Sequence, residues 1–145
     1  MRKTMICVIG PSSTGKTTTI RKVYELLGGK LEEKELKKDF LGVLKYDNTV
    51  IGCESEGDPP GEDQKEDLEF LMSKEKCDIV IGASRTRGIT VNNVQTLSRK
   101  YKYEVIWFYL AYVYDRLNND AYDVLEQKNA EIIVGFVNQI IQGKI

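Results

Sequence analysis

The chain has 145 residues, of which 41% are hydrophobic and 30% charged, and this length and composition predict one globular domain spanning residues 1–145. Its 21 basic and 22 acidic residues leave a net charge of −1, so we expect neither a nucleic-acid partner nor attraction to anionic lipid. The absence of histidine excludes histidine-based catalytic triads and most zinc sites.

The apolar runs and the cysteines indicate a cytoplasmic protein. No stretch approaches 18 consecutive apolar residues, which predicts that no helix crosses a membrane. The apolar run of residues 5–9 is too short for the core of a signal peptide. Cys7, Cys53 and Cys77 lie in apolar, strand-like stretches and form no C-x-x-C pair, so we expect buried, reduced thiols.

Patterns typical of strands and helices alternate along the chain. The apolar run of residues 5–9 predicts a buried strand, and the segment 16–27, with apolar residues on one face, predicts a helix. Residues 40–46 and 49–53 flank Asp47-Asn48, which tolerate positive φ, and together predict a β-hairpin. The elements expected after a loop at 56–61 are a helix at 62–76, a strand at 78–83, a helix at 90–100, a strand at 103–110 and a helix over about 118–142.

This alternation predicts an α/β fold of three layers. Strands that alternate with helices favour right-handed crossovers and a mostly parallel sheet covered on both faces, here with an antiparallel hairpin at one edge. The last helix is expected to pack into the core through one apolar stripe, made of Leu125, Ile132, Ile133, Phe136, Val137, Ile140 and Ile141.

A glycine-rich loop joins the first strand to the first helix. Gly10-Pro-Ser-Ser-Thr-Gly15-Lys16-Thr17 matches the pattern G-x-x-x-x-G-K-[ST] in full. The two glycines let the backbone approach an anion closely, and the amide groups at the start of the helix add partial positive charge. A strand-to-helix turn without a ligand is the alternative, but a turn alone explains the lysine and the two glycines poorly.

The spacing assigns a role to each residue of this loop. Lys16 is expected to reach the β- and γ-phosphates of a nucleoside triphosphate, and the hydroxyl of Thr17 to bind magnesium. Thr18 is placed to contact the α-phosphate. The residues expected to bind the nucleotide are Gly10, Ser12, Ser13, Thr14, Gly15, Lys16, Thr17 and Thr18.

This loop resembles the Walker A motif of P-loop NTPases, and the size and layout of the chain resemble those of the small P-loop kinases. The sharp similarity covers only residues 5–27. The strand order that this resemblance implies is 40–45, 49–54, 78–83, 5–9 and 104–110. It implies binding of ATP, or another nucleoside triphosphate, with Mg²⁺, followed by phosphoryl transfer to a small acceptor or by hydrolysis. The alternative is a non-catalytic nucleotide-binding module whose bound state controls a protein partner.

The chain departs from that family where a carboxylate usually ends the strand beside the loop. The tip of the strand at 78–83 reads Gly82-Ala83-Ser84-Arg85, and Asp78 lies at its other end, ~20 Å away at the rise of a β-strand. We therefore interpret Asp78 as a structural residue at the start of the strand. The missing acid favours the non-catalytic alternative unless another segment supplies one.

Carboxylates that could replace it follow the second strand of the hairpin. The end of that strand should bring Glu54, Glu56 and Asp58 to the same sheet edge as the glycine-rich loop, since ligands of open α/β sheets bind at the carboxyl edge. Asp58 is the first choice to serve magnesium and orient the nucleophile, and Glu56 is the second. A turn-forming aspartate before Pro59 is the other interpretation of Asp58.

Two arginines follow the central strand directly. Arg85 and Arg87 should project from the carboxyl edge, where they suit a second phosphate or the charge that develops on a transferred phosphoryl group. They could instead be surface arginines paired with Glu56 or Asp58. Ser84 is a further candidate, as a contact for a metal-bound water.

Overall fold

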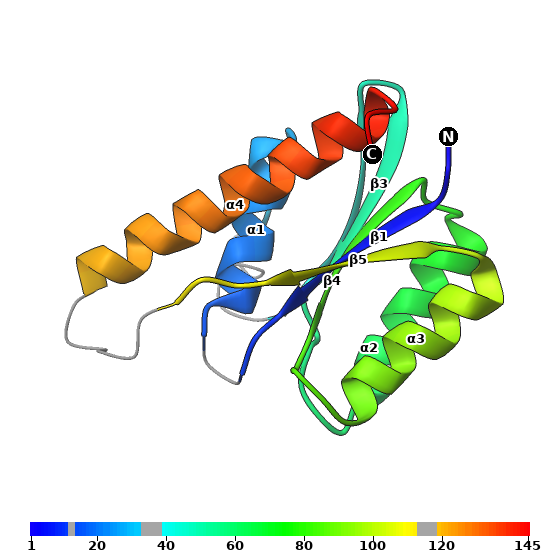
Figure 1. Ribbon diagram of the computed structural model, residues 1–145, viewed down its shortest axis with the longest axis horizontal. Coiled ribbons are helices and arrows are strands. Elements are labelled where there is room, and N and C mark those ends of the chain that lie inside the picture. Colours follow the sequence, from blue (N-terminus) through cyan, green and yellow to red (C-terminus); the bar gives the residue numbers. More distant parts are fainter. Residues whose placement is uncertain (12–13, 33–38, 113–118) are drawn as a thin grey trace.

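The computed structural model describes residues 1–11, 14–32, 39–112 and 119–145. Within these residues the chain forms an α/β fold with five strands and four helices. In chain order these are β1 (Thr4–Ile9), α1 (Lys16–Leu26), β2 (Leu41–Tyr46), β3 (Thr49–Glu54), α2 (Glu62–Glu69), β4 (Ile79–Ser84), α3 (Ile89–Tyr101), β5 (Glu104–Tyr109) and α4 (Asn119–Ile141). Helices α1 and α4 cover one face of the sheet, and α2 and α3 cover the other (Figure 1).

The sheet has the strand order expected from the sequence, β2-β3-β4-β1-β5. β1 pairs in parallel with both β4 and β5, and β3 pairs in parallel with β4. Only β2 runs antiparallel to its neighbour, because Asp47 and Asn48 adopt positive φ values of 50° and 58° and reverse the chain tightly. This order places the end of β1, where the glycine-rich loop begins, between the ends of β4 and β5 at the carboxyl edge.

Each face of the sheet carries its own hydrophobic cluster. On one face α4 packs against α1, and the fully buried Ile133 and Val137 join Ile20 and Val23 there. On the other face Leu68, Leu71, Val94 and Leu97 of the α2–α3 side pack on Met5, Cys7 and Val80. Because β1 is buried on both faces, its sequence is a continuous apolar run rather than an alternating one.

The final helix differs from its predicted stripe. Ile132 is 50% exposed, whereas its neighbour Ile133 is fully buried, so the prediction for Ile132 was wrong. Successive helical residues lie about 100° apart around the axis, and only one of the pair can face α1. The side chains of α4 that are buried in the core are Ala130, Ile133, Val137 and Ile140.

Three other expectations have definite outcomes. The segment 62–76 is not one α-helix, because α2 ends at Glu69 and the chain continues as a π-helical segment, Phe70–Lys74. Asp78 is structural as predicted, since its carboxylate accepts a hydrogen bond of 2.9 Å from the backbone N–H of Val50. The three cysteines are buried and free, also as predicted.

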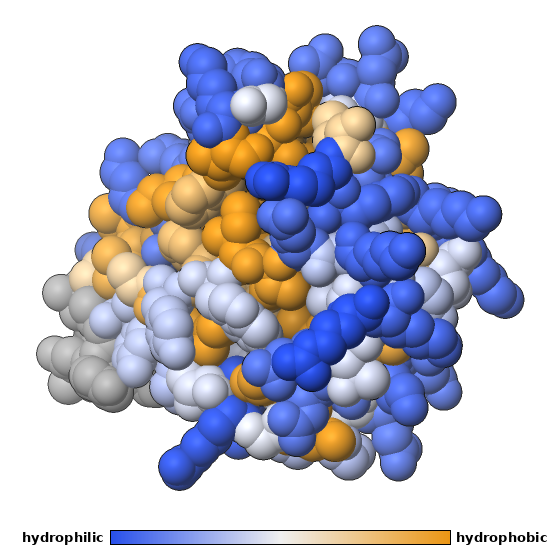
Figure 2. Space-filling view, turned by 45° about the vertical axis from the view of Figure 1, so that its right-hand side comes forward, coloured by the Kyte–Doolittle hydropathy of each residue, from blue (hydrophilic) through white to orange (hydrophobic). Residues whose placement is uncertain are grey.

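Nine large apolar side chains among the described residues are exposed at the surface. Trp107 and Tyr109 of the edge strand β5 are 37% and 67% exposed. Figure 2 shows hydrophobic surface gathered in a band on one side of the molecule, with hydrophilic side chains around it. None of the helices in the described part of the chain is both long enough and apolar enough to span a bilayer.

Candidate functional site

The loop between β1 and α1 depends on its two glycines. Gly15 has a φ of 91°, a conformation that residues with a side chain rarely adopt. A Cβ on Gly10 would lie 2.6 Å from the hydroxyl of Thr14, which folds back to donate a hydrogen bond of 2.7 Å to the carbonyl of Pro11. The first strand therefore leads through a tight loop directly into α1. Ser12 and Ser13, also expected to bind nucleotide, lie outside the described residues.

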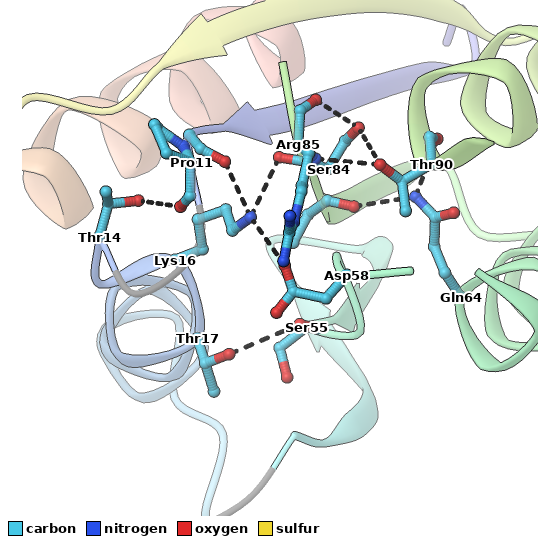
Figure 3. Close-up of polar contacts among 12 residues, drawn as sticks. Pro11, Thr14, Lys16, Thr17, Ser55, Asp58, Gln64, Ser84, Arg85 and Thr90 are labelled. Atoms are coloured by element: carbon cyan, nitrogen blue, oxygen red, sulfur yellow. Dashed lines mark hydrogen bonds and ion pairs between the residues drawn. The ribbon is translucent and has the colours of Figure 1, made fainter. Parts of the chain in front are cut away.

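Lys16 directs its ammonium group to the carboxyl edge of the sheet. Its Nζ donates hydrogen bonds to the carbonyl oxygens of Gly10 and Ser84, at 2.9 and 3.4 Å, and approaches Asp58 Oδ1 at 3.5 Å (Figure 3). The lysine is only 6% exposed, and this burial lowers the pKa of Lys16 while the charge of Asp58 opposes the change. A nearly buried cation thus has a single carboxylate partner among the described residues.

Asp58 bridges Lys16 and Arg85. Its Oδ1 accepts a hydrogen bond of 2.9 Å from Arg85 Nε and lies 3.5 Å from Lys16 Nζ. Partial burial pushes the pKa of Asp58 upward, but the hydrogen bond from Arg85 and the charge of Lys16 outweigh it and hold that pKa below its usual value. Asp58 thus lies at the edge expected from the sequence, and Arg85 forms the ion pair that the sequence left as an alternative.

A second carboxylate, which the sequence analysis missed, contacts Thr17. The Thr17 hydroxyl donates a hydrogen bond of 2.6 Å to Asp39 Oδ1 and lies 3.5 Å from the carbonyl oxygen of Ser55. The Ser55 hydroxyl also donates to Asp39, at 3.3 Å. Asp39 precedes β2, and the antiparallel register of the hairpin, continued beyond the strands, sets it opposite Glu56. The Asp47-Asn48 turn fixes that register, so the signal was present in the sequence.

Glu56 lies beside Asp39 rather than beside Lys16. Its partial burial, together with the charge of Asp39 and a hydrogen bond with it, raises the pKa of Glu56 to about 7. Burial and the charges of Asp63 and Glu66 likewise raise the pKa of Asp67 to about 6. Asp39 and Glu56 therefore form an acidic pair beside Thr17.

These shifts predict how the stability of the nucleotide- and metal-free protein depends on pH. Unfolded carboxylates titrate near pH 4, so the folded chain binds more protons than the unfolded chain up to about pH 7, and stability should fall as pH rises through that window. Glu56→Gln should remove the part of this loss of stability that occurs near pH 7, and it should raise the melting temperature at pH 7 by roughly a few degrees.

Melting curves from pH 4.5 to 8 measure this effect. Glu25→Gln, which alters an exposed carboxylate of α1, should leave the wild-type profile unchanged. If the melting temperature of Glu56→Gln falls with pH as much as that of the wild type, the titrating group is Asp67. Asp67→Asn should then show a melting temperature that no longer falls with pH. A profile that rises between pH 5 and 7 in the wild type would contradict the reasoning for both groups.

Glu54 does not reach the carboxyl edge, contrary to expectation. It is fully buried over Gly82, where its Oε1 accepts a hydrogen bond of 2.8 Å from the backbone N–H of Ala83. A Cβ on Gly82 would lie 2.6 Å from that oxygen, so the strand neighbour must be glycine to admit the carboxyl group. Burial raises the pKa of Glu54 well above its usual range. We assign it a structural role beneath the site.

A buried polar network holds the turn that carries the arginines. The Ser84 hydroxyl contacts the carbonyl of Arg85 at 2.8 Å and Thr90 Oγ1 at 3.1 Å, and it is inaccessible to solvent. The side-chain amide of Gln64 donates to the carbonyls of Ala83 and Thr90 (Figure 3). Asn93 in turn donates to Gln64, at 3.0 Å. Ser84 thus positions Arg85 and is not accessible as a contact for a metal-bound water.

Helix α4 contributes a carboxylate that the sequence did not indicate. The Glu126 side chain forms a hydrogen bond with that of Thr18, and its Oε2 lies 2.8 Å from the position that a Cβ on Gly15 would take. Partial burial raises the pKa of Glu126, against the opposing effect of Lys22 and Thr18. Glu126 is far from the loop in sequence, so only the docking of α4 on α1 brings it there.

Arg87 stands apart from the cluster around Lys16. It is exposed and has neither a hydrogen-bond nor an ion-pair partner among the described residues. It lines, with Arg85 and Pro59, a pocket of about 470 Å³ beside the β1–α1 loop. Of the two predicted arginines, the structure therefore brings only Arg85 into contact with Asp58.

The donors around Thr17 fit a hard cation. In the described ranges no three cysteine, aspartate or glutamate side chains form a group able to hold a metal by themselves. Mg²⁺ needs no such group where phosphates are present, because one or two protein oxygens with phosphate and water complete its shell. The Thr17 hydroxyl and the Asp39 carboxylate, which already contact each other, are oxygen donors of this kind.

Comparisons with known proteins leave this arrangement to be interpreted on its own. No protein-family model matches the chain. A search of curated proteins also finds no match. The function must therefore be argued from the β1–α1 loop and from the side chains gathered around it.

Proposed function

We propose that the chain is a P-loop NTPase-like protein that binds ATP, or another nucleoside triphosphate, with Mg²⁺, and that it transfers or hydrolyses the γ-phosphoryl group. The observation that carries the proposal is the position of Lys16. A lysine that opens a helix is expected at the surface, yet Lys16 is 6% exposed and directs Nζ to the carboxyl edge of the sheet. Removing an ammonium group from water is costly unless anions compensate it.

The neighbours of Lys16 compensate its charge only in part. They are two carbonyl oxygens and Asp58, whose carboxylate is shared with Arg85. A triphosphate held by the amide groups of the loop and by the start of α1 would supply the remaining negative charge. The loop, the lysine and the helix terminus therefore support one ligand, a polyphosphate.

Thr17 and Asp39 are the residues that would hold Mg²⁺. The cation, when bound with the nucleotide, neutralises charge on the β- and γ-phosphate oxygens. The chain's own residues account for the remaining tasks. Lys16 binds the terminal phosphates, Asp58 orients the nucleophile, and Arg85, fixed by Asp58 at 2.9 Å, stabilises charge on the transferred group.

The positions of Asp39 and Asp58 favour an enzyme over a non-catalytic module. The tip of β4 has no carboxylate, but Asp39 contacts Thr17 at 2.6 Å and Asp58 lies 3.5 Å from Lys16 Nζ. These contacts support Asp39 as an acceptor for the metal and Asp58 as an acceptor for the nucleophile, although neither residue lies on the strand beside β1. A regulatory module would bind nucleotide without turnover, and it has no need for the second acid.

Calorimetric titration with ATP, with and without Mg²⁺, tests the proposal. We expect binding that Mg²⁺ strengthens in the wild type, and loss of that strengthening in Thr17→Val, which removes one hydroxyl and preserves the shape of the side chain. Thr96→Val, on the exposed side of α3, should behave as the wild type. An absence of ATP binding by the wild type would refute the proposal.

Asp58→Asn separates the catalytic role from the binding role. We expect turnover to fall by ~100-fold or more, as for the loss of a positioned acid–base group, with ATP affinity changed far less. The melting temperature should change little, because the Asp58 side chain is half exposed and Lys16 keeps its hydrogen bonds to the carbonyl oxygens of Gly10 and Ser84. ATP turnover by the wild type and by Asp123→Asn, an exposed position of α4, provides the comparison. ATP binding without turnover in the wild type would identify a regulatory module.

A further inference from the structure

A pocket opens beside the β1–α1 loop at the carboxyl edge of the sheet. It measures about 470 Å³ and is lined by residues 85–88 together with Pro11, Pro59 and Ile89. Its walls thus come from three segments, which are the β1–α1 loop, the segment after Asp58 and the turn between β4 and α3. A volume of this size accommodates a small metabolite.

The pocket has an excess of positive charge. Arg85 is paired with Asp58 at 2.9 Å, whereas Arg87 has no partner among the described residues. Gly88 and Ile89, at the start of the 13-residue helix α3, also line the pocket, and the first turn of that helix has neither an acidic residue nor a side-chain cap. The helix terminus adds roughly half a positive charge to that of Arg87. A phosphate monoester, which carries about −1.5 to −2, matches this charge better than a carboxylate does.

The pocket adjoins the position expected for the γ-phosphate. Asp58 contacts Lys16 on one side and Arg85, a wall of the pocket, on the other. Pro59, the next residue in the chain, and Pro11, from the β1–α1 loop, complete the shared boundary. Figure 3 shows Lys16, Asp58 and Arg85 converging at this boundary from three different segments.

We propose that this pocket binds the second substrate, a small phosphate monoester whose phosphate group contacts Arg87 and whose hydroxyl group faces Asp58. The inference rests on the proposed function, because it places an acceptor beside a bound triphosphate. It makes Arg87 a residue that selects the acceptor, and Asp58 the group that orients the acceptor hydroxyl.

The chemical step follows from this placement. The acceptor oxygen forms a bond to the γ-phosphorus, and the bond from that phosphorus to its bridging oxygen breaks. The electron pair of that bond stays with the departing nucleoside diphosphate. The hydroxyl proton passes to the Asp58 carboxylate and then to water. Because little bonding to the nucleophile develops before the transition state, a weakly basic carboxylate is sufficient to orient the hydroxyl and take the proton late.

Calorimetry with inorganic phosphate as the probe tests the pocket. The protein is first saturated with Mg²⁺ and a non-hydrolysable ATP analogue, so that phosphate cannot occupy the β1–α1 loop. We expect one phosphate site, weakened at least tenfold in Arg87→Gln, with the analogue affinity of that variant changed far less. Arg99→Gln, at an exposed position near the other end of α3, should bind phosphate as the wild type does. Sulfate should compete with phosphate, and acetate should not.

The other possible results distinguish a failure of the pocket inference from a failure of the proposed function. Normal analogue binding without a phosphate site, or with a site that Arg87→Gln leaves unchanged, overturns the inference and leaves the proposed function intact. Acetate that binds as tightly as phosphate overturns the choice of a phosphate monoester. If the analogue fails to bind, the proposed function fails. Phosphate is then titrated into Lys16→Ala and into the double variant Lys16→Ala/Arg87→Gln. Weaker phosphate binding by the double variant would support the pocket, and equal binding would overturn it.

Discussion

Replacing Lys16 with alanine should weaken Mg²⁺-dependent ATP binding by ~10- to 100-fold, because a charge-assisted contact contributes about 1.5–3 kcal/mol. The lysine is nearly buried and has one shared carboxylate partner, and in the proposed function a triphosphate supplies the additional negative charge. The fold should persist, since Asp58 keeps its hydrogen bond with Arg85 and no hydrophobic core residue is lost. Calorimetry measures the affinity, and thermal melting monitors the fold.

Lys45→Ala provides the matched control for that experiment. Lys45 lies at an exposed position of β2, away from the carboxyl edge, and its replacement should leave ATP affinity unchanged. Equal affinity in Lys16→Ala and in the wild type would show that the glycine-rich loop does not bind the triphosphate. A variant that loses cooperative melting would instead show that the lysine is structural, and Lys16→Met would then separate loss of charge from loss of packing.

Replacing Ile133 with alanine should destabilise the protein by about 2–5 kcal/mol, whereas Ile132→Ala should change stability by no more than ~0.5 kcal/mol. The two isoleucines are neighbours in α4, but Ile133 is fully buried in the cluster with α1 and Ile132 is half exposed. Urea unfolding of both variants measures the difference. Equal losses in the two variants would contradict the orientation of α4 in the structure.

Truncation after Asn129 should have the larger effect. It removes Ile133, Val137 and Ile140, and burial of three such side chains contributes roughly 5–9 kcal/mol. A domain of this kind is stable by about 5–15 kcal/mol, so the truncated chain should be insoluble or lack cooperative melting. A soluble truncated chain that melts cooperatively would show that α4 is peripheral to the core.

The features formed by residues close together in the chain could be predicted from the sequence alone. The glycine-rich loop is contiguous, and its residues interact within one strand–loop–helix unit, so spacing was enough to find it. The edge hairpin also followed from the Asp47-Asn48 turn, whereas the order of the parallel strands was expected from the resemblance to small P-loop kinases. For the glycine-rich loop and the hairpin, the sequence pattern and the structure that it specifies lie close together in the chain.

Only the tertiary structure decided which distant side chains meet that loop. Asp39 reaches Thr17 through the register of the hairpin, and Glu126 reaches Thr18 through the packing of α4 on α1. Glu54 is withdrawn from the edge because Gly82, on the neighbouring strand, leaves space for its carboxyl group. Local pattern could not distinguish Ile132 from Ile133, because both fit an apolar stripe and the position of α1 selects the face that is buried. Contacts between distant segments depend on packing geometry, which residue spacing along one element does not contain.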